Sequence, residues 1–215
     1  MSIRNTFEHE LARLQEQVEE IGRMVECAYQ NLFDALAMKD KAAMELVLKN
    51  DHNINEMQRQ IESQCLKLIT RQQPVARDLR VISSVLKMVG DIERVGDHVR
   101  DMAELLLRNN LQPISGYSAH LDVMAMATKE VFHDAVDAFV SNSVEGSQKV
   151  IKNDDVIDEL FNKVKKDIIA GLKSEHSRED EYIDMMMLTK YLEKIGDHAV
   201  NVAEWHIFRE TGIIA

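Results

Sequence analysis

The sequence predicts an all-α fold of two pseudo-symmetric antiparallel three-helix bundles, six helices in all. Residues that break helices are scarce, with only 2 prolines and 8 glycines among 215 residues. Apolar residues recur at every third or fourth position over long stretches, which is the period of an amphipathic helix. Two segments also occur twice, about 100 positions apart. This repetition indicates that the chain is an internal duplication.

The apolar period and the turn residues together place six helices along the chain. They are expected at about residues 6–37, 42–69, 74–108, 118–139, 144–172 and 177–209. Pro74 is expected in the first turn of the third helix, where proline is well tolerated, and Ser177 is expected to cap the sixth. The cluster of asparagine, proline and glycine at 109–116 predicts the boundary between halves. The repeats are therefore expected at 1–112 and 113–215, and short loops favour antiparallel neighbours.

Charge and composition exclude several classes of partner. A formal net charge of −11 disfavours nucleic acid and anionic membrane surfaces, because both carry negative charge. No apolar run reaches the roughly 18 residues of a membrane span, and the N-terminus lacks the apolar region of a signal peptide. Cys27 and Cys65 have no paired spacing, so we expect both to pack as small apolar residues in a reducing compartment. A cytoplasmic protein without membrane insertion is the expectation.

The longer repeat is segment 93–98, Glu-Arg-Val-Gly-Asp-His, which returns at 193–198 as Glu-Lys-Ile-Gly-Asp-His. A glycine inside a helix costs about 1 kcal/mol relative to alanine, so Gly96 and Gly196 require a physical reason. Close helix packing is one explanation, and clearance for a bound ion is the other. The histidine after each aspartate is expected to pack or to lie on the surface, with an edge ligand of an ion as the alternative.

Acidic residues in both halves share helix faces, because they lie three or four residues apart. A shorter repeat, Lys-Asn-Asp at 49–51 and again at 152–154, places further carboxylates on the preceding helix of each half. If these helices pack side by side, their carboxylates face one another and suit a hard cation, which prefers oxygen ligands. The candidate ligands are Asp51, Glu93, Asp97, Asp101, Asp154, Asp158, Glu193, Asp197 and Asn201.

The nature of such an ion stays open at this level, with divalent or trivalent Fe, Mn, Mg, Ca or Zn all compatible. A solvated charged face is the alternative that needs no ion. A different metal site is suggested by Glu130 and His133, whose spacing is that of ferritin-like metal-dependent oxidases and metal stores. Those sites need two Glu-x-x-His motifs, and this chain has one. Nucleophile motifs and glycine-rich phosphate loops are missing, so an enzyme is not expected.

A basic segment interrupts this acidic chain between the second and third predicted helices. It contains Arg71, Arg77 and Arg80, whereas the corresponding segment of the second half, residues 174–180, has a different sequence. A departure from the repeat is where one half can have a role of its own, so these arginines are candidates for docking a partner. Ordinary capping and solubility are the alternative.

Segment 72–80, Gln-Gln-Pro-Val-Ala-Arg-Asp-Leu-Arg, and the doubled motif together resemble the PhoU family, accessory proteins of bacterial phosphate-specific transport. The resemblance covers essentially the whole chain. It implies two symmetric three-helix bundles, in some members with multinuclear metal clusters. It also implies a negative regulator that reports phosphate sufficiency, with the ATPase subunit of the phosphate transporter and a sensor histidine kinase as partners. We also expect a homodimer.

Carried onto this chain, the metal-binding motif of the family falls on Glu93, Asp97, Glu193 and Asp197. The chain departs from symmetry at two nearby positions. Asn55 stands where the second half has Asp158, and Asn201 stands opposite Asp101. The charge or the occupancy of the two sites is therefore expected to differ.

Overall fold

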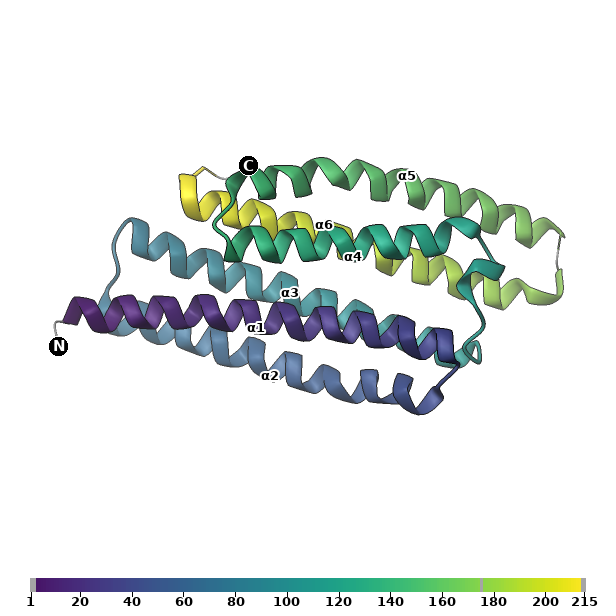
Figure 1. Ribbon diagram of the computed structural model, residues 1–215, viewed down its shortest axis with the longest axis horizontal. Helices are drawn as coiled ribbons and strands as arrows, with labels where there is room; N and C mark the ends of the chain where they lie inside the picture. Colours follow the sequence, from purple (N-terminus) through teal and green to yellow (C-terminus); the bar gives the residue numbers. More distant parts are fainter. Residues whose placement is uncertain (1–2, 175, 214–215) are drawn as a thin grey trace.

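Helices account for nearly all of the chain that the computed structural model describes, residues 3–174 and 176–213 (Figure 1). The long helices are α1 (Ile3–Met38), α2 (Lys41–Gln72), α3 (Arg77–Arg108), α4 (Ala119–Val140), α5 (Val144–Ser174) and α6 (Glu179–Thr211). Two short 3-10 turns, η1 (Ile114–Gly116) and η2 (His176–Arg178), precede α4 and α6. Within these ranges the chain forms no strand, and the predicted all-α class is confirmed.

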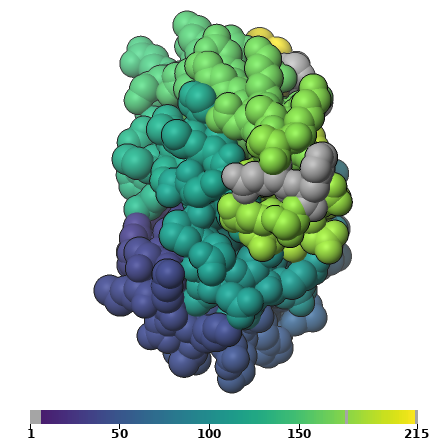
Figure 2. All heavy atoms as spheres, turned by 90° about the vertical axis from the view of Figure 1, so that its right-hand side faces the viewer, coloured from purple at the N-terminus to yellow at the C-terminus, as the bar shows by residue number. Residues whose placement is uncertain are grey.

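The six helices form two bundles that lie against each other. In Figure 1, α1 and α4 lie in front of α3 and α6, while α2 and α5 form the lower and upper edges. The helices of each half pack on one another, α3 and α6 make the most extensive contact between the halves, and α1 meets α4 over a shorter stretch. Figure 2 shows the first half below the second at the end where α1 turns into α2. The predicted pair of antiparallel three-helix bundles is confirmed.

One continuous apolar core runs through both halves. In α1 the residues at helical spacing, including Leu14, Ile21 and Leu32, are fully buried. Val95 of α3 and Ile195 of α6 occupy the same place in the two repeats and are also fully buried. Because α3 and α6 contribute apolar residues to the same core, burial of apolar surface holds the two bundles together. The result is a single helical body that carries both acidic segments.

Two of the predicted helix starts are wrong, for reasons that lie in the backbone. Pro74 lies in the loop before α3 instead of in its first turn. The residue before a proline is disfavoured in helical conformation, and Gln73 is left-handed (φ 46°) with its N–H bonded to a carbonyl in the last turn of α2. Ser177 does not cap α6, because it lies inside η2. The cap position belongs to Arg178, whose side chain makes no capping hydrogen bond.

The two cysteines differ in their surroundings. Cys65 is fully buried, as expected, but Cys27 is exposed, so the expectation that both pack inside is wrong for Cys27. Its sulfur faces outward from α1 and accepts a hydrogen bond from the Asn31 amide at 3.4 Å. None of the described helices combines the length and the apolarity needed to cross a membrane.

The duplication is visible in the turns and in the helix lengths. Lys39 and Asn142 follow α1 and α4, and both adopt left-handed backbone conformations with φ of 54° and 55°. α1 has 36 residues whereas α4 has only 22. When the two turns are superposed, the N-terminal third of α1 has no helical counterpart in α4. The first half therefore has a surface, between this part of α1 and α2, that the second half lacks.

Candidate functional site

The acidic residues of the first half come from two adjacent helices and face one another. Asp51 of α2 is buried, with 8% of its surface exposed. Its carboxyl pKa is raised by burial and then by the negative charge of Asp97 on α3, with a smaller contribution from Asp101. The pKa of Glu93 is raised in the same way, by burial first and then by the charges of Asp97 and Asp51. α2 and α3 therefore place these carboxyl groups close enough for their charges to repel one another.

The glycine of each repeated motif is what lets the paired helices approach. A Cβ atom on Gly96 would lie 3.3 Å from the Cδ1 and Cγ2 atoms of Ile54 on α2. A Cβ atom on Gly196 would lie 2.8 Å from Cδ1 of Ile157, the corresponding residue of α5. The close-packing explanation of both glycines is confirmed. Because each glycine precedes the central aspartate, the same approach brings the acidic faces of the two helices together.

Cationic side chains already meet part of the first acidic cluster. Arg94 donates to Asp97 at 3.1 Å, and Arg100 donates to Asp101 at 2.7 Å. Asn55 donates its amide N–H to Oδ2 of Asp51 at 2.9 Å. The other Asp51 oxygen, Oδ1, and the Asn55 amide oxygen are both buried without a hydrogen-bond partner. Buried acceptors normally have a partner, and two unsatisfied oxygens beside carboxylates fit the donor set of a hard cation.

The second acidic cluster is similar in position but differently compensated. The pKa of Asp154 on α5 is raised by burial, then by the charges of Asp158 and of Asp197 on α6. Two lysines of α6 itself meet this cluster: Lys194 bonds Asp197, and Lys190 lies 2.5 Å from Glu193. Each cluster therefore receives part of its neutralising charge from its own helix, as arginine from α3 and as lysine from α6.

Asn201 lies in a shallow hollow together with Asp154 and Asp197, with a volume of about 380 Å³. Its amide N–H donates to Oδ1 of Asp91 on α3 at 2.9 Å. The residue predicted as a ligand of the second site thus also ties the two halves together.

The described conformation brings the predicted ligands near one another without gathering them around a point. Within residues 3–174 and 176–213, no group of three or more His, Cys, Asp or Glu side chains is arranged to hold one metal ion. Several of these carboxylates would have to change their side-chain conformation to reach one ion. Metal binding at these residues stays a prediction.

The two repeated histidines lie between the acidic clusters, where α3 meets α6. The rings of His98 and His198 are 5.6 Å apart, and His98 stacks on Tyr191 at 5.5 Å. His198 Nδ1 lies 2.9 Å from Oδ1 of Asp91. Burial lowers the pKa of His98, and the neighbouring His198 lowers it further. The packing interpretation of both histidines agrees with these contacts.

Asp91 and Tyr191 are functional neighbours that the sequence analysis missed. They lie 100 positions apart, so they occupy the same place in the two repeats, and each contacts the histidine of the opposite half. Their different chemistry makes the joint between the bundles asymmetric. The repeat register alone could have identified them as an equivalent pair, but only the packing of α3 on α6 places them beside the histidines.

The Glu-x-x-His motif of α4 does not point into a bundle. His133 has 62% of its side chain exposed, and its Nδ1 lies 2.9 Å from Oε1 of Glu26 on α1. Together with Glu130 it lines a groove of about 790 Å³ between α1 and α4. Ferritin-like sites are built from side chains that project into the bundle core. Glu130 and His133 instead line a groove between two helices, and His133 contacts Glu26 across it.

The three predicted partner-binding arginines lie on different surfaces. Arg71 lines a groove between α1 and α2. Arg77 is exposed at the start of α3, close enough to Arg209 of α6 to lower the pKa of that buried guanidinium, although burial is the larger cause. Arg80 is partly buried beside Gly212, and its Nε has no hydrogen-bond partner. The structure therefore separates Arg71, on the α1 side, from Arg77 and Arg80, on the α6 side.

Comparison with known sequences shows which proteins share both halves of this chain. The sequence pattern described as PhoU domain matches residues 18–106 and again residues 121–206. A phosphate-specific transport system accessory protein PhoU homolog of Clostridium acetobutylicum is 32% identical over 210 residues, covering 97% of this chain and 96% of that protein. The PhoU homolog 1 of Thermotoga maritima is 30% identical over 207 residues, covering 96% of this chain and 89% of that protein.

Solved structures agree with the sequence matches. The crystal structure of the phosphate transport system regulatory protein PhoU from Streptococcus pneumoniae superposes with a TM-score of 0.88 at 27% identity, covering 97% of this chain and 99% of that one. The crystal structure of PhoU from Pseudomonas aeruginosa superposes with a TM-score of 0.89 at 26% identity, covering 96% and 100%. The similarity therefore extends over both bundles and over their relative placement.

Proposed function

The chain belongs to the PhoU family, and from this premise we propose that it is a negative regulator of phosphate uptake and of phosphate-starvation signalling. The observation that carries the proposal is similarity over nearly the full length of proteins named as phosphate transport accessory proteins, in both repeats. A regulator of this kind binds and releases partners, and it has no need of a reaction centre. We accordingly propose a non-enzymatic protein that acts in the cytoplasm.

The proposed partners are the ATPase subunit of the phosphate transporter and a sensor histidine kinase. A helical body with two similar halves offers a physical basis for contacting two proteins at once, because each bundle presents related but unequal surfaces. The longer α1 of the first half is such a difference. A homodimer would double these surfaces, and is part of the proposal.

We further propose that metal ions bind at the two acidic clusters and tune partner docking. In the first half the ion would be held by Asp51, Glu93, Asp97 and Asp101, with the unsatisfied Asn55 oxygen beside them. In the second half the corresponding residues are Asp154, Asp158, Glu193, Asp197 and Asn201. A bound ion would supply positive charge that offsets the repulsion between carboxylates. The carboxylates determine where that charge would lie. Arg94 and Arg100 reduce the charge required in the first half, as Lys190 and Lys194 do in the second.

The decisive experiment is complementation in a bacterial strain that lacks its own PhoU. In phosphate-replete medium, a phosphate-starvation reporter should be active in the strain with an empty vector and repressed when this chain is expressed. Co-purification should then recover the transporter ATPase or the sensor kinase with the tagged protein. A reporter that stays active, despite folded protein at a normal level, would contradict the proposed function.

A further inference from the structure

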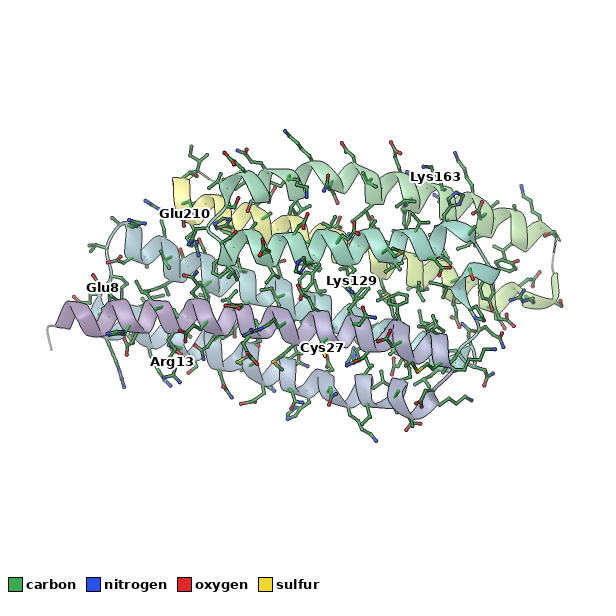
Figure 3. All side chains as sticks on the ribbon, viewed as in Figure 1. Glu8, Arg13, Cys27, Lys129, Lys163 and Glu210 are labelled. Atoms are coloured by element: carbon green, nitrogen blue, oxygen red, sulfur yellow. The ribbon has the colours of Figure 1, made fainter. Side chains whose placement is uncertain are left out.

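A basic groove lies between the N-terminal third of α1 and the C-terminal half of α2, and we call it the α1–α2 groove. Its volume is about 570 Å³, and it is lined by Glu10, Arg13, Gln17, Glu56, Arg59, Gln60, Ser63, Gln64, Lys67, Leu68 and Arg71. Figure 3 labels Arg13 on the side of α1 that faces α2. Four of these residues are basic and two are acidic, in a protein with a formal net charge of −11. The groove thus has the opposite sign to the rest of the molecule.

The positive charge of the groove is arranged in a row along α2. Arg59, Lys67 and Arg71 lie at multiples of four residues, so they project from one side of the helix. Arg59 has Glu56 at 3.6 Å, but Lys67 and Arg71 form no ion pair among the described residues. Like charges four residues apart on a helix, such as Lys67 and Arg71, repel each other. Because Lys67 and Arg71 are exposed and have no compensating charge, the row favours an anionic partner.

The row is private to the first half of the molecule. The positions of α5 that correspond to Arg59, Lys67 and Arg71, 103 residues further on, carry Asn162, Ala170 and Ser174. α4 is also too short to provide the opposite wall, which in the first half is the N-terminal part of α1. The duplication that repeated the acidic clusters therefore left this groove in one copy only, which suits a partner that binds once per chain.

The polar lining indicates what kind of anion fits. The amide oxygen of Gln17 is buried and has no hydrogen-bond partner, so it calls for an N–H or O–H donor. The row spans about 18 Å from residue 59 to residue 71, at 1.5 Å per residue of helix. A single phosphate group is much shorter than the row and would reach only part of it. A polypeptide carries backbone and side-chain donors together with carboxylates spaced along its length.

We propose that the α1–α2 groove docks an acidic polypeptide segment of a partner protein. Carboxylates of that segment pair with Arg59, Lys67 and Arg71 along one wall and with Arg13 along the other. A donor of the segment satisfies the Gln17 oxygen. This inference rests on the proposed function only because it requires a protein partner. It adds that the partner has an acidic docking segment and that this segment binds in the α1–α2 groove.

Fluorescence anisotropy with a labelled synthetic peptide of about 12 residues, with glutamates four residues apart, tests the proposal. The purified chain should bind this peptide, and binding should weaken as salt is raised from about 20 to 150 mM, because exposed ion pairs are screened. A peptide with glutamine in place of each glutamate should bind at least about tenfold more weakly. The double substitution Lys67→Glu with Arg71→Glu should also lower affinity at least about tenfold, and Lys67→Gln with Arg71→Gln should give a smaller loss.

The matched control is Lys163→Glu with Lys166→Glu on α5, which makes the same change in net charge on an exposed face of the corresponding helix. This control should retain the affinity of the wild-type chain, and circular dichroism should show that all variants are folded. Equal loss in the control, or no binding of the acidic peptide at concentrations up to about 1 mM, would overturn the proposal.

A second copy of the chain is the competing occupant, since its surface is also acidic. If Lys67→Glu with Arg71→Glu abolishes self-association in sedimentation velocity while the peptide fails to bind, the occupant is another copy and the proposal is wrong. These measurements use the isolated protein. Their failure would leave the complementation result standing, and a failed complementation would leave peptide binding intact.

Discussion

His206 is a buried histidine for which the first half has an apolar equivalent. It is fully buried, its Nδ1 lies 2.7 Å from the Ser147 hydroxyl, and its Nε2 has no hydrogen-bond partner. Its pKa is lowered to about 4, first by burial and then by the nearby positive charge of Arg209, while Glu210 raises it by a smaller amount. Leu106 stands at the same place in the first repeat and is also fully buried. The site therefore accepts the neutral imidazole and resists its protonation.

This site predicts a pH dependence of stability. The pKa of His206 is lower in the folded chain than its ordinary value of 6.5, so the unfolded state binds the proton more tightly between about pH 6.5 and 4. Stability should therefore fall as pH falls through that window, by at most about 3 kcal/mol from this residue. His206→Leu should remove this part of the loss. Denaturant unfolding at pH 7 and pH 5 measures it, and an unchanged difference between the two pH values in the variant would contradict the assignment.

Thr128 shows the same kind of difference between the repeats. Its hydroxyl is buried in α4 without a hydrogen-bond partner, and Val25 of α1 stands at the corresponding position, fully buried. Thr189 of α6 is equally buried, but its hydroxyl donates to the Met185 carbonyl at 2.7 Å. A buried threonine hydroxyl can therefore be satisfied, as in Thr189, or unsatisfied, as in Thr128. Only the contacts in the folded chain distinguish the two cases.

At the scale of the helix pair, glycine sets the distance between the acidic faces. Gly96 and Gly196 lie under Ile54 and Ile157, but the second contact is tighter, at 2.8 Å against 3.3 Å for an added Cβ. Gly90, also in α3, has nothing within 4 Å of that position. The three glycines therefore share a helical setting and differ in the room around them.

Alanine substitutions at these glycines should separate helix propensity from packing. Gly90→Ala should stabilise the protein by up to about 1 kcal/mol, because alanine is the better helix former and the position is open. Gly196→Ala should be destabilising by about 1 kcal/mol, since overpacking of the Ile157 contact outweighs the gain in propensity. Gly96→Ala should fall between them. Urea denaturation gives all three values, and the interpretation fails if Gly196→Ala proves as stable as Gly90→Ala.

For the whole molecule, the two acidic clusters belong to one helical body and differ in how their buried oxygens are met. Each cluster is met by two cations of its own helix, Arg94 and Arg100 in the first half and Lys190 and Lys194 in the second. In the first cluster the buried oxygens of Asp51 and Asn55 have no partner, whereas the buried Oε2 of Glu193 in the second lies 2.5 Å from Lys190. If ions bind, the first cluster should therefore hold an ion more tightly than the second, because no cation of the protein meets its buried Asp51 and Asn55 oxygens.

Metal content gives the test of this assignment. Protein purified without chelator should lose more bound metal on Asp97→Ala than on Asp197→Ala, and should lose nearly all of it when both are changed. Glu45→Ala, at an exposed carboxylate of α2 outside the clusters, is the control and should leave the content unchanged. Elemental analysis by mass spectrometry measures each sample. The same metal content in the double variant and the wild-type chain would remove these residues as ligands.

Local patterns in the sequence were sufficient for the helices, their order and the duplication. Periodicity and the scarcity of helix-breaking residues depend only on neighbours in the chain. All six long helices were therefore predicted, and their predicted ends differ from the observed ends by a few residues. The displaced starts at Pro74 and Ser177 depend on loop conformation, which propensity alone does not determine. The doubled motif and its candidate ligands could likewise be identified from the sequence, because a spacing of four residues determines which residues share a helix face.

Tertiary structure decided which faces meet. No local pattern requires α3 to pack on α6, so the contacts of Asp91 and Tyr191 with the opposite histidines could not be derived from spacing. The same holds for Arg13, which joins Arg59, Lys67 and Arg71 only because α1 lies beside α2. The sequence by itself determined the helices, the repeat and the family. Packing determined the partners of each side chain, since contacts between distant residues arise only when buried apolar faces bring helices together.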